Sequence, residues 1–555
     1  MPRHATNYRR AALIAIASLF VVHTAPLAQH APPTREQLGV VSFDNSGARA
    51  AQPDFLRGLA LLHSFMYGPS ADAFRRAQHA DAGFAMAYWG EALTYIHTGW
   101  RQENLAAANA ALDRLAPTRD ARLAMAGTTR ERLYGAAIEA YVAKGVPEPQ
   151  RARAFMDSMY AVARAYPHDL DARAFAALGG LTVNDLWPPA DPTLRAREHD
   201  VAEAFAMGVF KESPRHPGGV HYLIHVNDDP IYARRGLVAA RAYAKVAPDA
   251  DHALHMPSHI FVQLGLWDDA TRSNERAWPA SRAMPMTDSS DGPHASWHSL
   301  QWLQYSYLQQ GRWRAARALI DTARKILAGA PSDYWNDPDP RFVVSDLIFR
   351  YAAETGQGWA DVRPAVAAEG SDVRTPRGAN FSANAAYHAA VASVMTGDAA
   401  MGRAYLQRIR ARDTAGVAPQ RRARDEVAAA QIEALLATSR GDTTAALAAW
   451  DRAMTADEAI APLGPPSLIP THEWLGSLQL RRGNAKTAVA AYQKALERRP
   501  NRAAALLGLA RAQRAAGARA AAERTYRKLA QQWHGADPSM DDVIEVRRLR
   551  PANRE

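Results

Sequence analysis

A histidine-rich stretch, residues 216–259, holds the side chains of this chain best suited to chemistry. Two pairs within it, His221/His225 and His255/His259, have the H-x3-H spacing that places both rings on one face of a helix. Neutral imidazole is the commonest ligand for zinc, copper, iron or nickel. The stretch therefore predicts a transition-metal site. Its members are His216, His221, His225, His252, His255 and His259.

The two pairs are 34 residues apart, which is the period of a tetratricopeptide (TPR) repeat. Two neighbouring repeats should therefore present the same helix face. In TPR arrays, the first helix of each pair lines a concave groove, so these histidines are expected to line one groove. Numbering the other repeats in the same frame brings further residues to that groove. These are Asp228, His298, His63, Glu91, Tyr95 and Tyr305.

A structural role is the alternative for each histidine taken alone. His216 precedes Pro217 and His255 lies just before Pro257, and helices often begin at such positions. His216 is the strongest candidate for a structural member. So many imidazoles together would repel one another if protonated, however, and this favours a common ligand for the cluster.

Two carboxylates are candidates for a ligand or general base in the groove, Glu91 and Asp228. For Glu91 the alternative is a solvated acid on a helix surface. Trp89, Trp302 and Tyr305 could stack on a ligand, although aromatic residues at helical spacing usually pack in a core. The sequence contains no P-loop, dinucleotide fingerprint, G-x-S-x-G elbow or H-E-x-x-H motif.

The N-terminus has the pattern of a secretory signal peptide. Three arginines precede a short apolar run, residues 11–22, and small residues follow. We expect cleavage after Ala25 or Ala28 and a periplasmic or secreted protein, with an uncleaved anchor as the alternative. No later stretch is apolar enough to span a bilayer. The chain has no cysteine, so any metal must be bound by imidazole and carboxylate.

The formal net charge of +10 does not indicate a nucleic-acid-binding protein. The arginines alternate with acids along helical segments, which is typical of solvated faces. A nucleic-acid role would require a clustered basic stripe.

Composition and apolar spacing predict an all-α TPR-type solenoid of stacked antiparallel helix pairs. The clearest repeats lie near the C-terminus, where Gly483/Gly517, Ala488/Ala522 and Tyr492/Tyr526 are each 34 residues apart. Glycines at 265, 311, 397 and 441 are expected at turns between helices. The predicted segments are a signal peptide (1–28), a disordered lead-in (29–50), a TPR-like solenoid with the histidine groove (51–360), a linker (361–385), further helix pairs (386–460), a C-terminal TPR pair (461–537) and a tail (538–555).

Several motifs, among them FAMAYWGEALTYIH, HPGGVHYLIHVNDDP and HALHMPSHIFVQLGLWDDATRSN, resemble those of secreted bacterial TPR-repeat proteins with a histidine-rich centre. The resemblance runs from about residue 55 to 538. It implies an α-solenoid, export and a shared role for the central histidines, but no particular reaction. The serine-rich MTDSSDGPHASWH before His298 departs from the pattern. The residues implied as metal ligands are His97, His221, His225, His252, His255, His259 and His298.

Two functions stay open at this point. In the first, the groove binds a divalent transition metal such as zinc, iron or copper, as a metal-dependent enzyme or a binding protein. In the second, the chain is a non-enzymatic scaffold whose groove binds a peptide or protein partner. Arg481, Arg511 and Arg514 in the last two repeats could then face a carboxylate of that partner.

Overall fold

The computed structural model describes residues 37–97, 102–189, 191–283, 296–329, 340–369, 383–412 and 419–549. Within these ranges the regular elements are all helices, apart from the short strands β1 and β2, which pair antiparallel. The predicted all-α class is confirmed. Pro33–Glu555 form one compact unit, and the predicted signal peptide lies outside the described residues.

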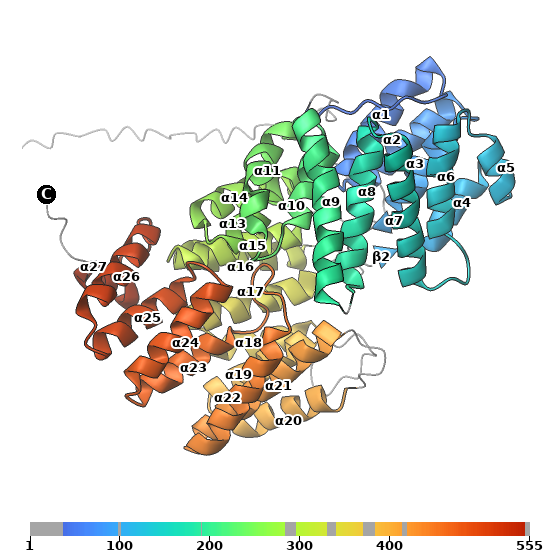
Figure 1. Ribbon diagram of the computed structural model, residues 1–555. Coiled ribbons are helices and arrows are strands. Elements are labelled where there is room, and N and C mark those ends of the chain that lie inside the picture. The colour runs from blue at the N-terminus through green and yellow to red at the C-terminus, as the bar shows by residue number, and fades with distance from the viewer. Residues whose placement is uncertain are drawn as a thin grey trace, which may run out of the picture. The chain divides into compact units, whose positions relative to one another are not determined.

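The elements follow one another in the order drawn in Figure 1. The first part contains η1 (Arg49–Ala51), α1 (Gln52–His63), α2 (Tyr67–Ala80), α3 (Ala85–Thr94), β1 (Ile96–His97), β2 (Gln102–Glu103), α4 (Leu105–Asp113), α5 (Arg119–Ala124), α6 (Thr129–Tyr141), α7 (Glu148–Ala165), α8 (Leu170–Leu186) and α9 (Pro192–Glu212). The central part contains α10 (Pro217–Val226), α11 (Ala233–Val246), α12 (Asp251–His255), α13 (Pro257–Gln263), α14 (Trp267–Ala283), α15 (Trp297–Gln309), α16 (Trp313–Ala328), α17 (Pro340–Thr355) and α18 (Trp359–Ala368). The last part contains α19 (Ala383–Met395), α20 (Ala399–Arg410), α21 (Pro419–Ser439), α22 (Thr443–Glu458), α23 (Thr471–Arg481), α24 (Ala485–Arg498), α25 (Ala503–Ala515), α26 (Arg519–Gln532) and α27 (Asp541–Leu549).

Nearly every helix packs on its successor, and alternate helices also touch, as in α15, α17, α19 and α21. This is the contact pattern of stacked helix pairs, in which each pair buries its apolar face on the next. Small residues make the stacking close. The Phe74 ring occupies the space where a side chain at Gly90 would lie, and Tyr492 does the same at Gly508.

The turns between paired helices occur at the predicted glycines. Gly265 and Gly311 have φ of 65° and 69°, a region that L-residues with a side chain rarely adopt. The other two predicted turn glycines, Gly397 and Gly441, also have positive φ, and so do Gly483 and Gly517 of the last repeats. The glycine pattern therefore correctly predicted the turns between these paired helices.

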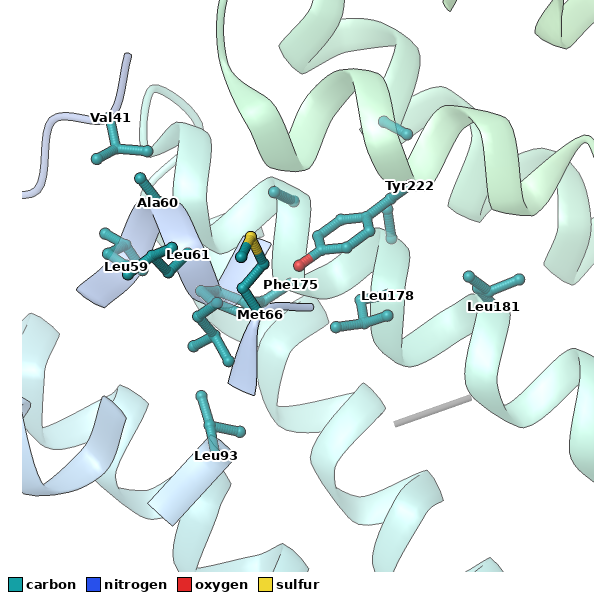
Figure 2. Packing of buried hydrophobic residues seen from close by; sticks show 14 of the residues in the cluster. Val41, Leu59, Ala60, Leu61, Met66, Leu93, Phe175, Leu178, Leu181 and Tyr222 are labelled. Carbon is teal, nitrogen blue, oxygen red and sulfur yellow. The ribbon is translucent and has the colours of Figure 1, made fainter. Parts of the chain in front are cut away.

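Three predicted boundaries need correction. Residues 38–43 were expected in a disordered lead-in, but Leu38, Val41 and Phe43 are buried, and Val41 joins the apolar cluster in Figure 2. Apolar side chains of this size gain stability by leaving water, so the segment packs instead of staying free. The expected linker, residues 361–385, overlaps α18 at its start and α19 at its end. Only residues 370–382 of this linker lie outside the described residues. The expected tail contains α27.

The C-terminal repeats pack against the central ones. Trp267 Nε1 donates to the Asn501 carbonyl at 2.8 Å, and Trp533 Nε1 donates to the Gln309 carbonyl at 3.0 Å. Arg502 forms a buried ion pair with Glu354 at 2.6 Å. These contacts hold α25 and α26 against the turns beside the histidine region. Among the helices of the described ranges, none is both long enough and apolar enough to cross a membrane.

Candidate metal centre

Six imidazoles meet in the central part of the chain as two groups of three. We name them the upstream group (His221, His225, His252) and the downstream group (His255, His259, His298), and together the imidazole centre. In each group, one ring nitrogen of every member lies within 4.8 Å of the others. The rings of His225 and His259, one from each group, have centroids 6.2 Å apart.

Local sequence explains how the helices present these rings. His216 caps α10, because its Nδ1 accepts from the Gly219 backbone N–H at 3.2 Å. Pro217 then begins the helix with its fixed φ, as predicted. Pro257, which has no N–H, separates α12 from α13, although Met256 stays in the helical region. The His255/His259 pair thus spans a break in the helix.

The Nδ1 atoms of the downstream group are held by acceptors. His255 Nδ1 donates to Asn274 Oδ1 at 2.6 Å, and the Asn274 amide nitrogen donates elsewhere, to the Ala270 carbonyl. His259 Nδ1 donates to Asp228 Oδ2 at 2.6 Å, and Gln263 donates to the other oxygen of Asp228. Hydrogen bonds of this kind fix the tautomer and ring orientation of metal-binding histidines.

The consequence is that two lone pairs face each other. With the proton of each neutral ring on Nδ1, the Nε2 atoms of His255 and His259 lie 3.1 Å apart. A proton or a metal ion between these two atoms would relieve the repulsion of their lone pairs. The third ring, His298, lies 4.8 Å from His255 between centroids, and its Nε2 is buried without a hydrogen-bond partner among the described residues. A proton can be shared by two of these ring nitrogens, whereas a metal ion can be bound by all three.

The upstream group has a related arrangement. His221 Nδ1 donates to the His63 carbonyl at 2.6 Å, so its Nε2 carries a lone pair. That Nε2 lies 3.0 Å from His252 Nε2, and the His225 ring is 4.7 Å from the His221 ring between centroids. Here the tautomer of one ring is fixed by a backbone oxygen from α1, far away in sequence.

Burial disfavours the protonated form of five of these rings. Desolvation, assisted by the neighbouring imidazoles, lowers the pKa of His221, His252 and His255. Burial and the His259 ring lower the pKa of His225 and of His298 to about 3. Neutral imidazole is the form that binds a metal ion.

Aromatic side chains form the walls of the centre. Phe65 packs edge-on against His221, with ring centroids 4.5 Å apart, and also contacts His225 and His252. Trp302 stacks on His259 at 4.1 Å. The proline-rich segment before α23 also lies against this indole, because a side chain at Gly464 would meet the Trp302 ring. The rings are therefore held in place by apolar contacts.

The structure brings together six of the seven predicted ligands. His97 lies in β1, where its ring stacks on Tyr67 with centroids 4.1 Å apart, and it belongs to neither group. On the predicted groove face, His221, His255 and His259 are buried, whereas His225, His252 and His298 are half-buried. The apolar walls shield part of this face from solvent.

The two carboxylate candidates have different surroundings. Asp228 touches the imidazole centre through His259. Burial alone would raise its pKa, but the His259 ring and the Gln263 amide outweigh burial and lower it. Glu91 is buried on α3, where Arg75 and Arg114 form ion pairs with it. Its contacts explain its burial as part of an ion-pair network.

A second polar cluster, which we name the buried triad (His63, Asp171, His216), adjoins the upstream group. His63 Nε2 and His216 Nε2 both donate to Asp171 Oδ1, at 2.8 and 3.3 Å. His63 Nδ1 is bonded to the Tyr222 hydroxyl at 3.0 Å. Each ring nitrogen has a partner within the protein, which agrees with the structural role predicted for His216.

Sequence reasoning did not find several residues that orient the rings. Asn274, Gln263 and the His63 carbonyl reach the centre from other helices or repeats. Gln263 lies four residues after His259, and Asn274 lies on α14, in the same repeat. An amide side chain on an otherwise apolar helix face is the only sequence signal that could have pointed to them. The carbonyl has no sequence signal.

The C-terminal arginines are partly engaged. Arg511 forms ion pairs with Asp542 and Glu545 of α27, at 2.5 and 2.6 Å. The helix that follows the last repeat therefore supplies the carboxylates that a peptide partner was expected to bring to Arg511. Arg481 and Arg514 are exposed.

Residues 479–538 match the tetratricopeptide repeat family model. The described part of the chain is an all-α solenoid of stacked helix pairs. Solved structures that resemble it include the human IFIT1 dimer with PPP-AAAA, at 11% identity and TM-score 0.36, covering 88% of this chain and 91% of that one. Another is the APC/C hetero-tetramer Cut9-Hcn1, at 12% identity and TM-score 0.33, covering 90% of each chain. No curated protein matches the sequence.

Proposed function

We propose that this TPR-type solenoid is a metalloprotein that binds a first-row transition metal in its imidazole centre. The observation that supports this most strongly is the pair of facing Nε2 atoms of His255 and His259, 3.1 Å apart, whose Nδ1 protons are both committed to other acceptors. Two nitrogens bound to one tetrahedral zinc or copper ion at about 2.0–2.1 Å are separated by a similar distance.

The donor set narrows the class of metal. Each group consists of imidazoles alone, and imidazole suits zinc, copper, iron or nickel, whereas magnesium, calcium and manganese prefer oxygen ligands. Three protein ligands leave one position of a tetrahedral ion open, as in catalytic zinc sites. Asp228 acts on the ion through His259, as the carboxylate that orients the ring. In this proposal export would place the centre in the periplasm or outside the cell.

Cobalt(II) provides a direct test, since its visible absorption reports the number and type of ligands. We expect the full-length chain to bind cobalt with the intense bands of a four-coordinate site, and zinc to displace it. The His255→Gln/His259→Gln variant should lose these bands. The exposed-histidine variant His79→Gln/His168→Gln is the matched control and should keep them. Bands that persist in the His255→Gln/His259→Gln variant would exclude the downstream group as the site.

A further inference from the structure

The two three-imidazole groups share one run of chain. His252 belongs to the upstream group and His255 to the downstream group, although they are only three residues apart on α12. Side chains with this spacing lie on the same face of a helix, with Cβ atoms about 5–6 Å apart. Two ions bound by the two groups would therefore be close neighbours.

Ring separations agree with this. Between the groups, the His252 and His255 rings have centroids 6.3 Å apart, and the His225 and His259 rings 6.2 Å. Within the upstream group the largest separation, His225 to His252, is also 6.2 Å. The groups thus adjoin as closely as members of one group do. Paired catalytic ions in proteins are typically about 3.5–4 Å apart.

Resting on the proposed function, we infer that the imidazole centre binds two copper ions side by side, each held by three imidazoles, with a small bridging ligand between them. Three protein ligands leave one open position on each ion, and adjacency lets one small anion occupy both. Copper is favoured because both groups consist of neutral nitrogen donors. Of the divalent first-row metals, copper also binds such donors most tightly.

The orienting hydrogen bonds support two separate sites. His221 in the upstream group and His255 in the downstream group each donate Nδ1 to a different element, the α1 end and α14 respectively. Each pair of close Nε2 atoms, at 3.0 and 3.1 Å, belongs wholly to one group. A single ion could use only one of these pairs fully. His225 and His252 in the upstream group and His298 in the downstream group are half-buried, so a metal ion could reach each group from solvent.

The test combines copper stoichiometry with electron paramagnetic resonance. The full-length chain is loaded with Cu(II), desalted and assayed for copper. We expect about two ions per chain, with the signal of isolated Cu(II) largely missing because bridged ions at about 3.5–4 Å couple their spins. His225→Gln in the upstream group and His298→Gln in the downstream group should each leave one ion, now with its full signal. His79→Gln should leave two coupled ions.

Each other outcome has a definite meaning. One ion in the unaltered chain would overturn the paired site while leaving the proposed function intact. Two ions with full, uncoupled signals would also overturn it, since the ions would then lie far apart. If the chain retains neither copper nor any other transition metal, the proposed function itself is overturned. Circular dichroism of each variant confirms folding, and if one of the two variants fails to fold, the other still decides between one ion and two.

Discussion

The downstream group and the buried triad both consist of three ionisable side chains, yet their nitrogens have opposite surroundings. In the buried triad, His63 and His216 donate to Asp171, and their remaining nitrogens meet a tyrosine hydroxyl and a backbone N–H. In the downstream group, the Nε2 atoms of His255 and His259 meet only each other's lone pair or another imidazole. Whether the ring nitrogens have hydrogen-bond partners within the protein therefore distinguishes a structural cluster from the proposed metal site.

The largest effect on stability is expected in the buried triad. Asp171→Ala would leave two buried imidazole N–H groups without their acceptor and should lower the free energy of unfolding by about 3–5 kcal/mol. Asp171→Asn keeps an oxygen acceptor and should cost less. Urea denaturation measures both. Metal binding by folded Asp171→Ala protein should stay near that of the unaltered chain; loss of metal without unfolding would show that the triad is part of the site.

In the downstream group, we expect a substitution to weaken metal binding strongly and to change stability little. His259→Gln removes a ligand, and we expect metal affinity to fall by more than about a hundredfold, beyond the effect of losing an orienting partner. Stability of the metal-free protein should change little by comparison. Competition with a chelator of known affinity measures the change. If affinity is kept, His259 is not a ligand.

Removing an orienting carboxylate is a milder test of the same group. Asp228→Asn should weaken metal binding by about 10–100-fold, because His259 loses the charged acceptor that orients its ring and increases its basicity. Asp229→Asn, one residue away, is the matched control and should bind normally. Equal affinities for these two variants would argue against an orienting role for Asp228.

Acid should destabilise the protein through its buried neutral histidines, including one outside both clusters. His388 is fully buried on α19, and burial lowers its pKa to about 4. Between pH 6.5 and 4 the unfolded chain therefore binds a proton that the folded chain does not, so stability falls as the pH decreases. At pH 5 this ring alone should cost about 2 kcal/mol. His388→Phe should flatten the pH dependence of the urea midpoint, whereas exposed His79→Phe should not.

Much of the fold could be predicted because it depends on local rules. The 34-residue spacing of Gly483 and Gly517 identified the repeat, and turn glycines such as Gly265 gave helix boundaries, since positive φ is a local requirement. Burial of the lead-in through Phe43 could not be predicted, because its partners, the rings of Phe55 and Trp89, are brought to it only by the folded chain.

The candidate site could be predicted only in part. H-x3-H spacing at the repeat period correctly placed His221, His225, His255 and His259 on neighbouring helix faces. That His252 would join His221 and not His255 depends on how α12 is rotated against α10, which spacing does not give. His97, taken from the family resemblance, lies apart from both groups. Its role as a ligand stays a prediction.

Elemental analysis of the native, full-length protein shows whether the imidazole centre binds a transition metal. After metal repletion and dialysis, we expect at least about one transition-metal ion per chain, falling steeply in His255→Gln/His259→Gln protein that is still folded. Less than about a tenth of an equivalent in the unaltered chain, or an unchanged content in that variant, would contradict it.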